Sequence, residues 1–339
     1  MKTYINKHQL DQIIAYISHE FETFATQKID GKVVFGKYKK GLILIPTPKT
    51  VIPFKKFLWP DGQEVALYSS NPEGDPLGRS EKSPSSRQAS NNKKYAFIGL
   101  TNCDAIALEK FLAEFSHTNL LPKRENILIV SSECKIDEFC FCTAFGHDKI
   151  TNFDLHLQTD QNGHAVFSGS KNGEKVLREN GVKSHMKKPD LKNITLNIPN
   201  IFNKKELSLG LDDLPRFKDF WQKIANNCFG CGACSAVCPL CFCTKHTEKN
   251  DLDSQNHSCL SWDSCFAENF SQIQNHLDLR PERVNRLYNW YHHKFVRAYL
   301  DKKDFLCTGC GRCIKACPAH LNQYKILSSI ENQEEKVNE

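Results

Sequence analysis

The stretch Cys228-Phe229-Gly230-Cys231-Gly232-Ala233-Cys234-Ser235-Ala236-Val237-Cys238-Pro239 decides the fold of the C-terminal region of this chain. A second stretch, Cys307-Thr308-Gly309-Cys310-Gly311-Arg312-Cys313-Ile314-Lys315-Ala316-Cys317-Pro318, repeats the spacing of its cysteines and the proline that follows. Four thiolates hold an iron–sulfur cube, and a doubled run with this spacing is typical of proteins that carry two [4Fe–4S] clusters. The repeat therefore predicts a domain built around a pair of clusters.

In such a pair, the fourth cysteine of each run reaches the cluster of the other run. The expected ligands of the first cluster are Cys228, Cys231, Cys234 and Cys317, and those of the second are Cys307, Cys310, Cys313 and Cys238. Glycines separate the ligands at positions 230, 232, 309 and 311. Glycine tolerates positive φ and lets backbone N–H groups approach the cluster sulfurs, so these positions suit the predicted role.

Three other interpretations of the cysteine runs remain open. Cys-x2-Cys pairs also bind structural zinc, although zinc sites combine two separated pairs and have no use for a third cysteine at the same interval. A fold that kept this pattern and lost its clusters is a second alternative. Disulfides are a third, but a secreted disulfide framework is normally a much smaller chain than 339 residues.

Composition favours an ordinary globular protein of two or three domains. The chain is 40% hydrophobic and 25% charged, and its formal net charge of +6 is too modest to indicate nucleic-acid binding. The first residues lack the apolar stretch of a signal peptide, and the longest apolar run, Leu42 to Ile45, is too short to cross a bilayer. We expect a cytoplasmic protein without membrane or nucleic-acid partners.

Local patterns predict several elements before the cysteine runs. Apolar residues at helical spacing indicate a helix from about Leu10 to Phe24, with Asn6 and Gln9 as its N-capping pair. A β-hairpin is expected from Val33–Phe35 and Leu42–Ile45. The polar stretches 69–94 and 160–189 are predicted to be an exposed loop and an insertion or linker, respectively.

A β–α–β unit is predicted in the middle of the chain. Tyr95 to Leu100 and Ile127 to Val130 have the composition of buried strands, and Ala105 to Phe115 has a helical pattern, so the two strands should be parallel. Cysteines follow the carboxyl ends of both strands, where ligands bind in open α/β sheets. A third cluster at Cys103, Cys134, Cys140 and Cys142 is one interpretation, and a set of free buried cysteines is the other.

The predicted fold class is α+β, with an α/β domain at residues 1–200 and a mostly helical two-cluster domain at residues 201–339. Residues 214–227 and 281–299 are expected to be helical, the latter with a basic face opposite its apolar stripe. That face is either an ordinary solvated surface or a docking site for an acidic partner. Four further cysteines have no resolved role and are expected to pack against the cluster domain or to bind another cluster: Cys241, Cys243, Cys259 and Cys265.

Taken together, these segments resemble the iron–sulfur β subunit of cytoplasmic sulfhydrogenases, which are NAD(P)-linked nickel–iron hydrogenases. They are also similar to the A subunit of anaerobic sulfite reductase. Besides the run that ends at Pro318, the matching stretches are Gly99-Leu100-Thr101-Asn102-Cys103-Asp104, the segment Cys134 to Cys142, Cys238-Pro239-Leu240-Cys241-Phe242-Cys243 and Trp262-Asp263-Ser264-Cys265-Phe266. Two stretches depart from the family pattern, namely Thr101-Asn102 before Cys103 and Thr143 to His147 after Cys142.

This resemblance implies an electron-transfer subunit in a hetero-oligomer. A flavin- and NAD(P)-binding subunit would exchange electrons with a hydrogenase subunit through clusters on this chain, or with a sulfite reductase subunit in the alternative case. No Gly-x-Gly-x-x-Gly after a strand and no Walker motif occurs, so no complete active site is expected on this chain. A scaffold in which metal only stabilises the fold is the non-redox alternative.

Overall fold

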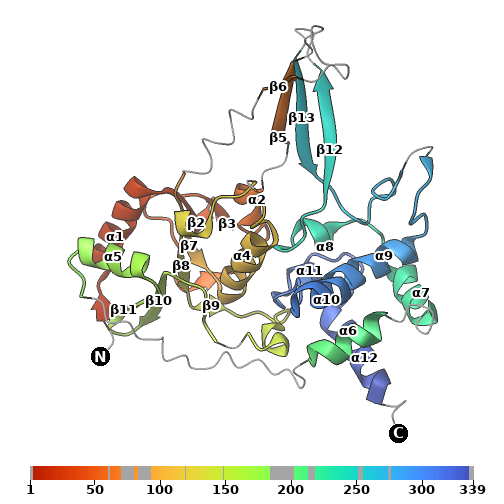
Figure 1. Ribbon diagram of the computed structural model, residues 1–339. Helices are drawn as coiled ribbons and strands as arrows, with labels where there is room; N and C mark the ends of the chain where they lie inside the picture. Colours follow the sequence, from red (N-terminus) through yellow and green to blue (C-terminus); the bar gives the residue numbers. More distant parts are fainter. Residues whose placement is uncertain are drawn as a thin grey trace.

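The computed structural model describes residues 3–59, 62–69, 80–82, 93–118, 120–147, 149–183, 202–212, 218–250, 255–273 and 276–335. Helices and sheets are mixed, as the predicted α+β class requires. Figure 1 shows a sheet with its covering helices formed by the N-terminal part of the chain, beside a helical part formed by the C-terminal residues. Residues on both sides of the predicted division at 200/201 lie outside this description, so that boundary stays a prediction.

A seven-stranded sheet forms the centre of the N-terminal part. Its spatial order is β1-β11-β10-β8-β7-β2-β3. Neighbours from β10 to β2 are parallel, whereas the outer pairs are antiparallel. The strands are β1 (Thr3–Ile5), β2 (Glu22–Ile29), β3 (Lys32–Lys37), β7 (Tyr95–Leu100), β8 (Ile127–Ser132), β10 (Leu155–Asp160) and β11 (Gly163–Ser168).

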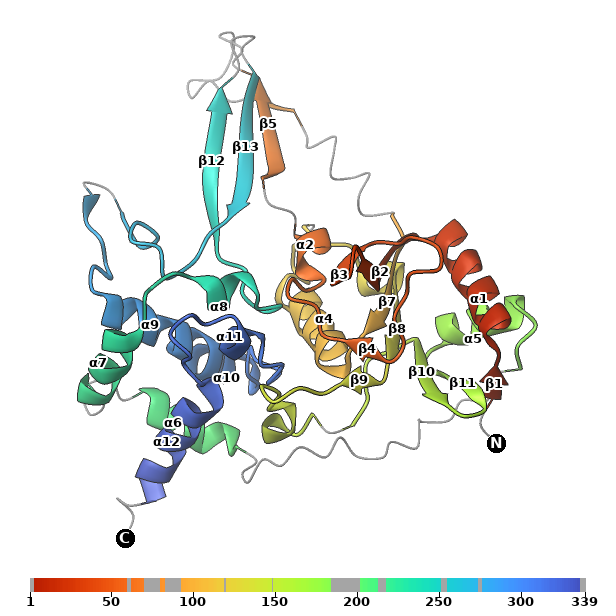
Figure 2. The same cartoon turned by 180° about the vertical axis from the view of Figure 1, so that it is seen from behind.

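Both faces of this sheet are buried, because alternate residues of its central strands enter different cores. In β7, Phe97 packs with the helix α4 (Asn102–Glu114), while Ala96 and Ile98 pack on the opposite face. That opposite face is covered by α1 (Lys7–Glu20) and α5 (Lys171–Glu179), which lie together in Figures 1 and 2. Continuous apolar strands are what a sheet covered on both sides requires. The predicted β–α–β unit with parallel strands is confirmed.

The N-terminal helix begins as predicted. Asn6 and Gln9 form a capping box in which each side chain accepts a hydrogen bond from the backbone N–H of the other residue. The predicted hairpin between Val33–Phe35 and Leu42–Ile45 is wrong. Strand β3 pairs with β2 instead, and Ile43 makes only an isolated bridge to Gln27. The partner of a strand is decided by the whole sheet, which local patterning does not report.

The stretch 160–189 was predicted to be an insertion or linker, and its described part is not. Strand β11 and helix α5 lie within it. Buried Val166 and Leu177 join the core beneath α1, and Ser170 caps α5 by accepting from the backbone N–H of Gly173. Of the predicted loop 69–94, the described residues include the short strand β6 (Ser80–Lys82), and most of the rest lies outside the described residues.

A second, four-stranded sheet joins distant parts of the chain. Its order is β12-β13-β5-β6, and it extends away from the rest of the molecule in Figures 1 and 2. The strands β12 (Thr244–Asn250) and β13 (Gln255–Trp262) follow the first cysteine run, whereas β5 (Gln63–Ser69) and β6 come from the N-terminal half. The two halves of the chain therefore share one sheet. A two-stranded sheet pairs β4 (Thr47–Pro48) with β9 (Cys134–Lys135).

The C-terminal part is helical and has its own core. Trp221, Tyr291, Phe295 and Phe305 are almost fully buried there and pack edge-to-face or tilted against neighbouring rings. The helices are α6 (Lys204–Asp212), α7 (Lys218–Asn227), α8 (Ala233–Ala236), α9 (Arg283–Tyr291), α10 (Ala298–Lys302), α11 (Arg312–Lys315) and α12 (Gln323–Glu335). The N-terminal part adds the four-residue helix α2 (Lys55–Leu58) and the 3-10 turns Arg124–Asn126 and Cys142–Phe145.

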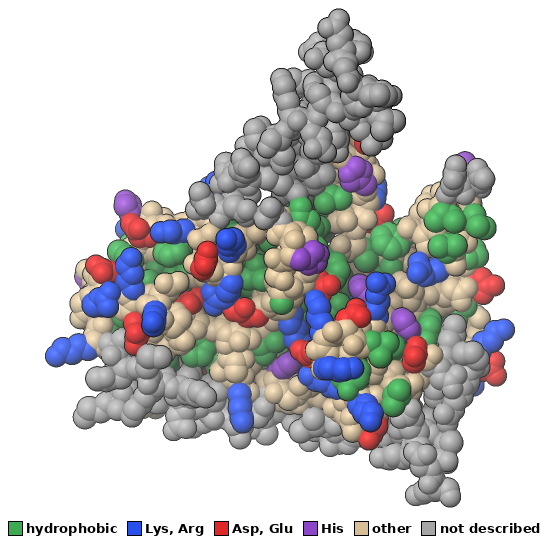
Figure 3. All heavy atoms as spheres, viewed as in Figure 1, with side chains coloured by type: hydrophobic (Ala, Val, Ile, Leu, Met, Phe, Trp, Pro, Cys, Tyr) green, Lys and Arg blue, Asp and Glu red, His purple; other side chains and the backbone are tan. Residues whose placement is uncertain are grey.

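The predicted basic face of the helix at residues 281–299 is only partly correct. Arg286 and Lys294 are buried rather than exposed. Arg286 donates to the backbone oxygens of Arg280 and Pro281, and a π-helical turn at His292–Arg297 interrupts the 3.6-residue period before α10. On the face drawn in Figure 3, Lys and Arg side chains are interspersed with Asp and Glu. Among the described residues, no helix is long and apolar enough to cross a membrane.

A buried ion pair ties the N-terminal part to the second cysteine run. Arg312 Nη1 and Nη2 donate to the two carboxylate oxygens of Asp104 over 2.6 and 2.8 Å, and Arg312 Nε donates to the backbone oxygen of Thr50. Asp104 lies in the first turn of α4 and also accepts from Thr101 Oγ1. Two-pronged pairing of this kind fixes orientation as well as distance.

Removing one partner should therefore destabilise the protein strongly. Asp104→Ala leaves the Arg312 guanidinium buried without its carboxylate, and we expect a loss of about 3–5 kcal/mol in the free energy of unfolding. The loss in the free energy of unfolding is measured from the first unfolding transition in urea. The matched control is Glu179→Ala, which removes an exposed pair with Arg178 and should cost at most about 1 kcal/mol. Equal losses in the two variants would contradict the structural role of Asp104.

Candidate iron–sulfur site

The two cysteine runs adopt the same local backbone. Gly232 and Gly311 precede the short helices α8 and α11 with φ of 71° and 75°, in the left-handed region that favours glycine. Gly230 and Gly309, two residues earlier in each run, also have positive φ. The predicted need for glycine at these four positions is confirmed. The backbone N–H groups of Gly230 and Gly309 point at the sulfurs of Cys228 and Cys307, each over 3.4 Å.

A cavity lies beside the first run, and cysteines from both runs line it. They are the four residues predicted to hold the first cluster, Cys228, Cys231, Cys234 and Cys317. Most of the remaining wall is apolar or aromatic and includes Leu287, Trp290 and Tyr291 of helix α9, and the polar Gln323 also borders the cavity. Cys231 is exposed, and the neighbouring Phe229 has 65% of its surface accessible to solvent. This cavity therefore lies close to the surface of the chain.

A second cavity lies deeper and shows the reciprocal exchange. Cys307, Cys310 and Cys313 of the second run line it together with Cys238 of the first run. Phe141, Leu240, Lys294 and Thr308 complete much of its wall. Trp290 borders both cavities, so the two are neighbours. The structure thus brings together the two crossed sets of cysteines that the spacing predicts.

The residues present fit a group rich in sulfur acceptors. Trp290 Nε1 and Thr308 Oγ1 are buried donors that find no hydrogen-bond partner among the described residues. Both side chains border cysteine-lined cavities, where the sulfurs of a bound group would accept these hydrogen bonds. Burial raises the pKa of Cys234 and of Cys307 to about 12, so these thiols keep their protons at neutral pH until metal binding removes them. The described residues contain no group of three or more His, Cys, Asp or Glu side chains spaced to hold a single metal ion.

The four cysteines predicted as a third site also lie near one another. Cys103 occupies the first turn of α4, Cys134 lies in β9, and Cys140 and Cys142 flank Phe141 in the following loop. Burial raises the pKa of Cys134 to about 11 and that of Cys142 to about 12. Cys140 adds to both shifts by charge repulsion, and Cys142 adds to the raised pKa of Cys103.

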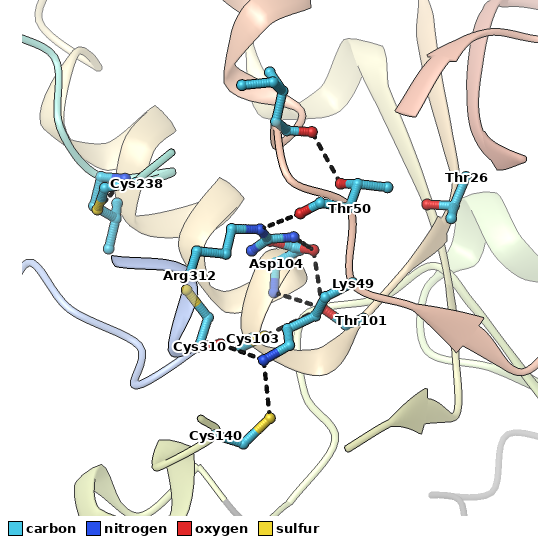
Figure 4. A network of polar contacts seen from close by, with 12 residues as sticks. Thr26, Lys49, Thr50, Thr101, Cys103, Asp104, Cys140, Cys238, Cys310 and Arg312 are labelled. Carbon is cyan, nitrogen blue, oxygen red and sulfur yellow. Dashed lines mark hydrogen bonds and ion pairs between the residues drawn. The ribbon is translucent and has the colours of Figure 1, made fainter. Parts of the chain in front are cut away.

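A half-buried lysine, Lys49, joins this group to the second run. Lys49 Nζ donates to Cys140 Sγ over 3.0 Å and to the backbone oxygen of Cys310 over 2.6 Å (Figure 4). It also donates to Asp137 Oδ1 over 2.9 Å. Burial opposes its charge, but the contacts with Cys140 and Asp137 outweigh burial and raise the pKa of Lys49. Lys49 therefore stays protonated beside the sulfurs. Nothing in the sequence singles it out, because its partners lie far away along the chain.

The loop that carries Cys140 and Cys142 packs directly on the second run. The Phe141 N–H donates to the backbone oxygen of Gly309. A Cβ atom at Gly309 would lie 2.6 Å from Cys142 Cα, and one at Gly311 would lie 2.1 Å from the backbone oxygen of Phe139. The two glycines are thus required by close approach as well as by φ. The third group of cysteines sits against the run that lines the second cavity.

The four cysteines without a predicted role are placed differently from one another. Cys265 and Cys259 are buried, the first in the C-terminal core and the second in β13. Cys241 and Cys243 are half-buried and line a third cavity together with Cys231. The other residues that line this cavity include Lys55, Trp59, Phe242, Trp262 and Asp263. The packing expected of these cysteines is seen for Cys265 within the C-terminal core and for Cys241 and Cys243 against it, and their chemical role stays open.

Comparisons with known proteins agree with the motifs. Residues 227–321 match the family described as a 4Fe-4S dicluster domain. The chain is 28% identical over 251 residues to the sulfhydrogenase 2 subunit beta of Pyrococcus furiosus, a match that covers 70% of this chain and 74% of that protein. No solved structure matches the chain. The resemblance to iron–sulfur sulfhydrogenase β subunits that the motifs predicted is therefore confirmed.

The close approach at Gly309 is testable by a single methyl group. Gly309→Ala should cost about 1–2 kcal/mol for the positive φ and a further about 1–3 kcal/mol for the collision with the Cys142 backbone. Urea unfolding measures the total, and hydrogen exchange of the amides in residues 139–147 should become faster. Gly31→Ala is the control, because Gly31 has φ of +76° and no atom within 4 Å of the added methyl group. Equal costs in both variants would rule out the collision.

Proposed function

We propose that this chain is an iron–sulfur electron-transfer subunit of a hydrogenase-type complex. The observation that carries the proposal is the exchange of Cys238 and Cys317 between the two cysteine runs, which surrounds each of two adjacent cavities with four thiols. The match to a dicluster domain supports [4Fe–4S] clusters as the occupants, and the similarity to a sulfhydrogenase β subunit supports the type of complex.

Two clusters are proposed, with the ligands Cys228, Cys231, Cys234 and Cys317 for the first and Cys307, Cys310, Cys313 and Cys238 for the second. When bound, a [4Fe–4S] cluster accepts and releases one electron at a time. The chain contributes thiolate ligands, backbone N–H groups directed at their sulfurs, and aromatic walls that exclude water from the sites. Trp290 borders both cavities, so the two proposed clusters would be neighbours.

A third cluster is proposed at Cys103, Cys134, Cys140 and Cys142. Its support is the convergence of these cysteines and their contact with the second run through the backbone of Phe141 and through Lys49. The half-buried Lys49 ammonium would balance part of the negative charge that four thiolates and a cluster would bring. The three sites would then follow one another from the N-terminal sheet, through the second cavity, to the first cavity near the surface.

We propose a hetero-oligomer as the working form. A flavin- and NAD(P)-binding subunit and a hydrogenase catalytic subunit are the proposed partners, and the similarity to a sulfhydrogenase subunit favours this assignment over a sulfite reductase. Exposed Cys231 and Phe229 place the first cavity near the surface, where electrons could pass to another subunit. Nickel in the isolated complex would support the hydrogenase assignment, whereas sirohaem absorbance would support the reductase.

Iron analysis of the protein, purified without oxygen, tests the proposed function. We expect about eight or more iron atoms per chain, with matching acid-labile sulfide and a broad absorbance that dithionite bleaches. Cys310→Ser should lose about four of them, because it removes a ligand of the second cluster. Cys259→Ser is the matched control, since Cys259 is buried in β13 and borders none of the cysteine-lined cavities described above. A colourless protein that contains zinc would contradict the proposal.

The third cluster has its own test. Cys103→Ser and Cys142→Ser should each lower the iron content by about four atoms per chain and leave the two other clusters reducible. The EPR spectrum of the reduced protein should lose one component in both variants. Unchanged iron content and an unchanged spectrum in both would show that these cysteines are free, and the two-cluster proposal would be unaffected.

A further inference from the structure

The two cysteine-lined cavities differ in charge. Among the described side chains that border the first cavity, none is charged. The second cavity is bordered by Lys294, which has only 3% of its surface exposed. A charge so deeply buried is costly unless something nearby balances it. The difference in charge affects the reduction potential of a bound cluster, because its reduced state carries one more negative charge than its oxidised state.

The ammonium group of Lys294 is held in place from several sides. Nζ donates to Cys238 Sγ over 3.3 Å and to the backbone oxygen of Leu306, the residue before Cys307, over 2.9 Å. It also lies 5.2 Å from the ring centroid of Trp290, which borders both cavities. The Leu306 N–H donates back to the Lys294 backbone oxygen. These contacts fix the cation beside a cysteine that crosses from the first run to the second site.

The backbone at this position is unusual. Lys294 lies in the π-helical turn His292–Arg297 that interrupts the helix between α9 and α10. Such turns alter the helical period, are rare, and often occur at functional sites. Lys294 follows Leu287 by seven residues and Tyr291 by three, so a regular helix would place it at the edge of the apolar stripe. In this turn its Nζ reaches Cys238 and the backbone oxygen of Leu306.

No carboxylate balances Lys294 among the described residues. It forms no ion pair with Asp or Glu there, in contrast to Lys49, which pairs with Asp137. Burial opposes its charge, and the group that lies closest to balance it is the sulfur of Cys238, 3.3 Å from Nζ. The counter-charge of this lysine is thus the sulfur of the second site itself.

We propose that Lys294 is a fixed buried cation that raises the reduction potential of the cluster held by Cys238, Cys307, Cys310 and Cys313. This inference rests on the proposed function, because it requires the two clusters. A positive charge near a cluster stabilises its more negative, reduced state, and a buried site screens that interaction only weakly. Beside the first run the nearby cation is Arg283, which packs next to Gly230 and is exposed, so solvent screens its charge far more than that of Lys294.

An EPR-monitored redox titration of the full chain, purified without oxygen, tests the inference. Cys310→Ser first identifies which midpoint potential belongs to the second cluster. Lys294→Met removes the charge but keeps a side chain of similar length, and it should lower the midpoint potential of the second cluster. The potential of the first cluster should shift less. Lys294→Arg keeps the charge and should leave the potential near its wild-type value. Lys303→Met is the control, because it removes a cation from the end of the same helix, over Tyr299, and should change neither potential.

The outcomes separate this inference from the proposed function. Two reducible clusters whose potentials are unchanged in Lys294→Met, with iron content intact, overturn the role of Lys294 and leave the proposed function standing. If Lys294→Met loses the iron of the second cluster, retention of iron and potential in Lys294→Arg still supports a required charge. Loss of iron from both variants, or a lowered potential in Lys294→Arg, overturns the inference. A wild-type protein without two reducible clusters contradicts the proposed function itself.

Discussion

Each cysteine-lined cavity depends on one side chain from the other run. Cys317 borders the cavity of the first run, and Cys238 borders that of the second. Neither set of four can form unless both runs, and the strands and helices between them, have reached their final positions. The exchange thus couples ligand assembly to the fold of the whole C-terminal part. Trp290 borders both cavities, so the two sites are neighbours, as electron transfer between two centres requires.

The remaining contacts support this exchange from the N-terminal side. The loop at Phe141 packs against the glycines of the second run, and the Asp104–Arg312 pair and Lys49 connect the same surfaces through charge. Buried cations without mobile water nearby interact strongly with thiolates, so their positions affect both the stability of the fold and the properties of any cluster. The contacts between the N-terminal part and the second cysteine run therefore affect both the stability of the fold and the properties of the proposed clusters.

Much of this was predictable where the signal is local. The spacing of the cysteines predicts the two crossed ligand sets, since the chemistry of a cube fixes that spacing, and continuous apolar runs predict the parallel strands β7 and β8. The pairing of β3 with β2 was missed, because partner choice depends on the whole sheet. Helix α5 was missed because its sequence is mostly polar. Lys49 and Lys294 were missed because their roles arise from contacts with residues distant in the sequence.

The central claim is that two clusters lie side by side and share crossed ligands. The most direct measurement is the EPR spectrum of the fully reduced protein, compared with that of Cys317→Ser. The account predicts a complex spectrum from two magnetically interacting clusters, which simplifies when Cys317, a residue of the second run, is removed and the first cluster is damaged. A spectrum of isolated, non-interacting centres, or one that Cys317→Ser leaves unchanged, would contradict it.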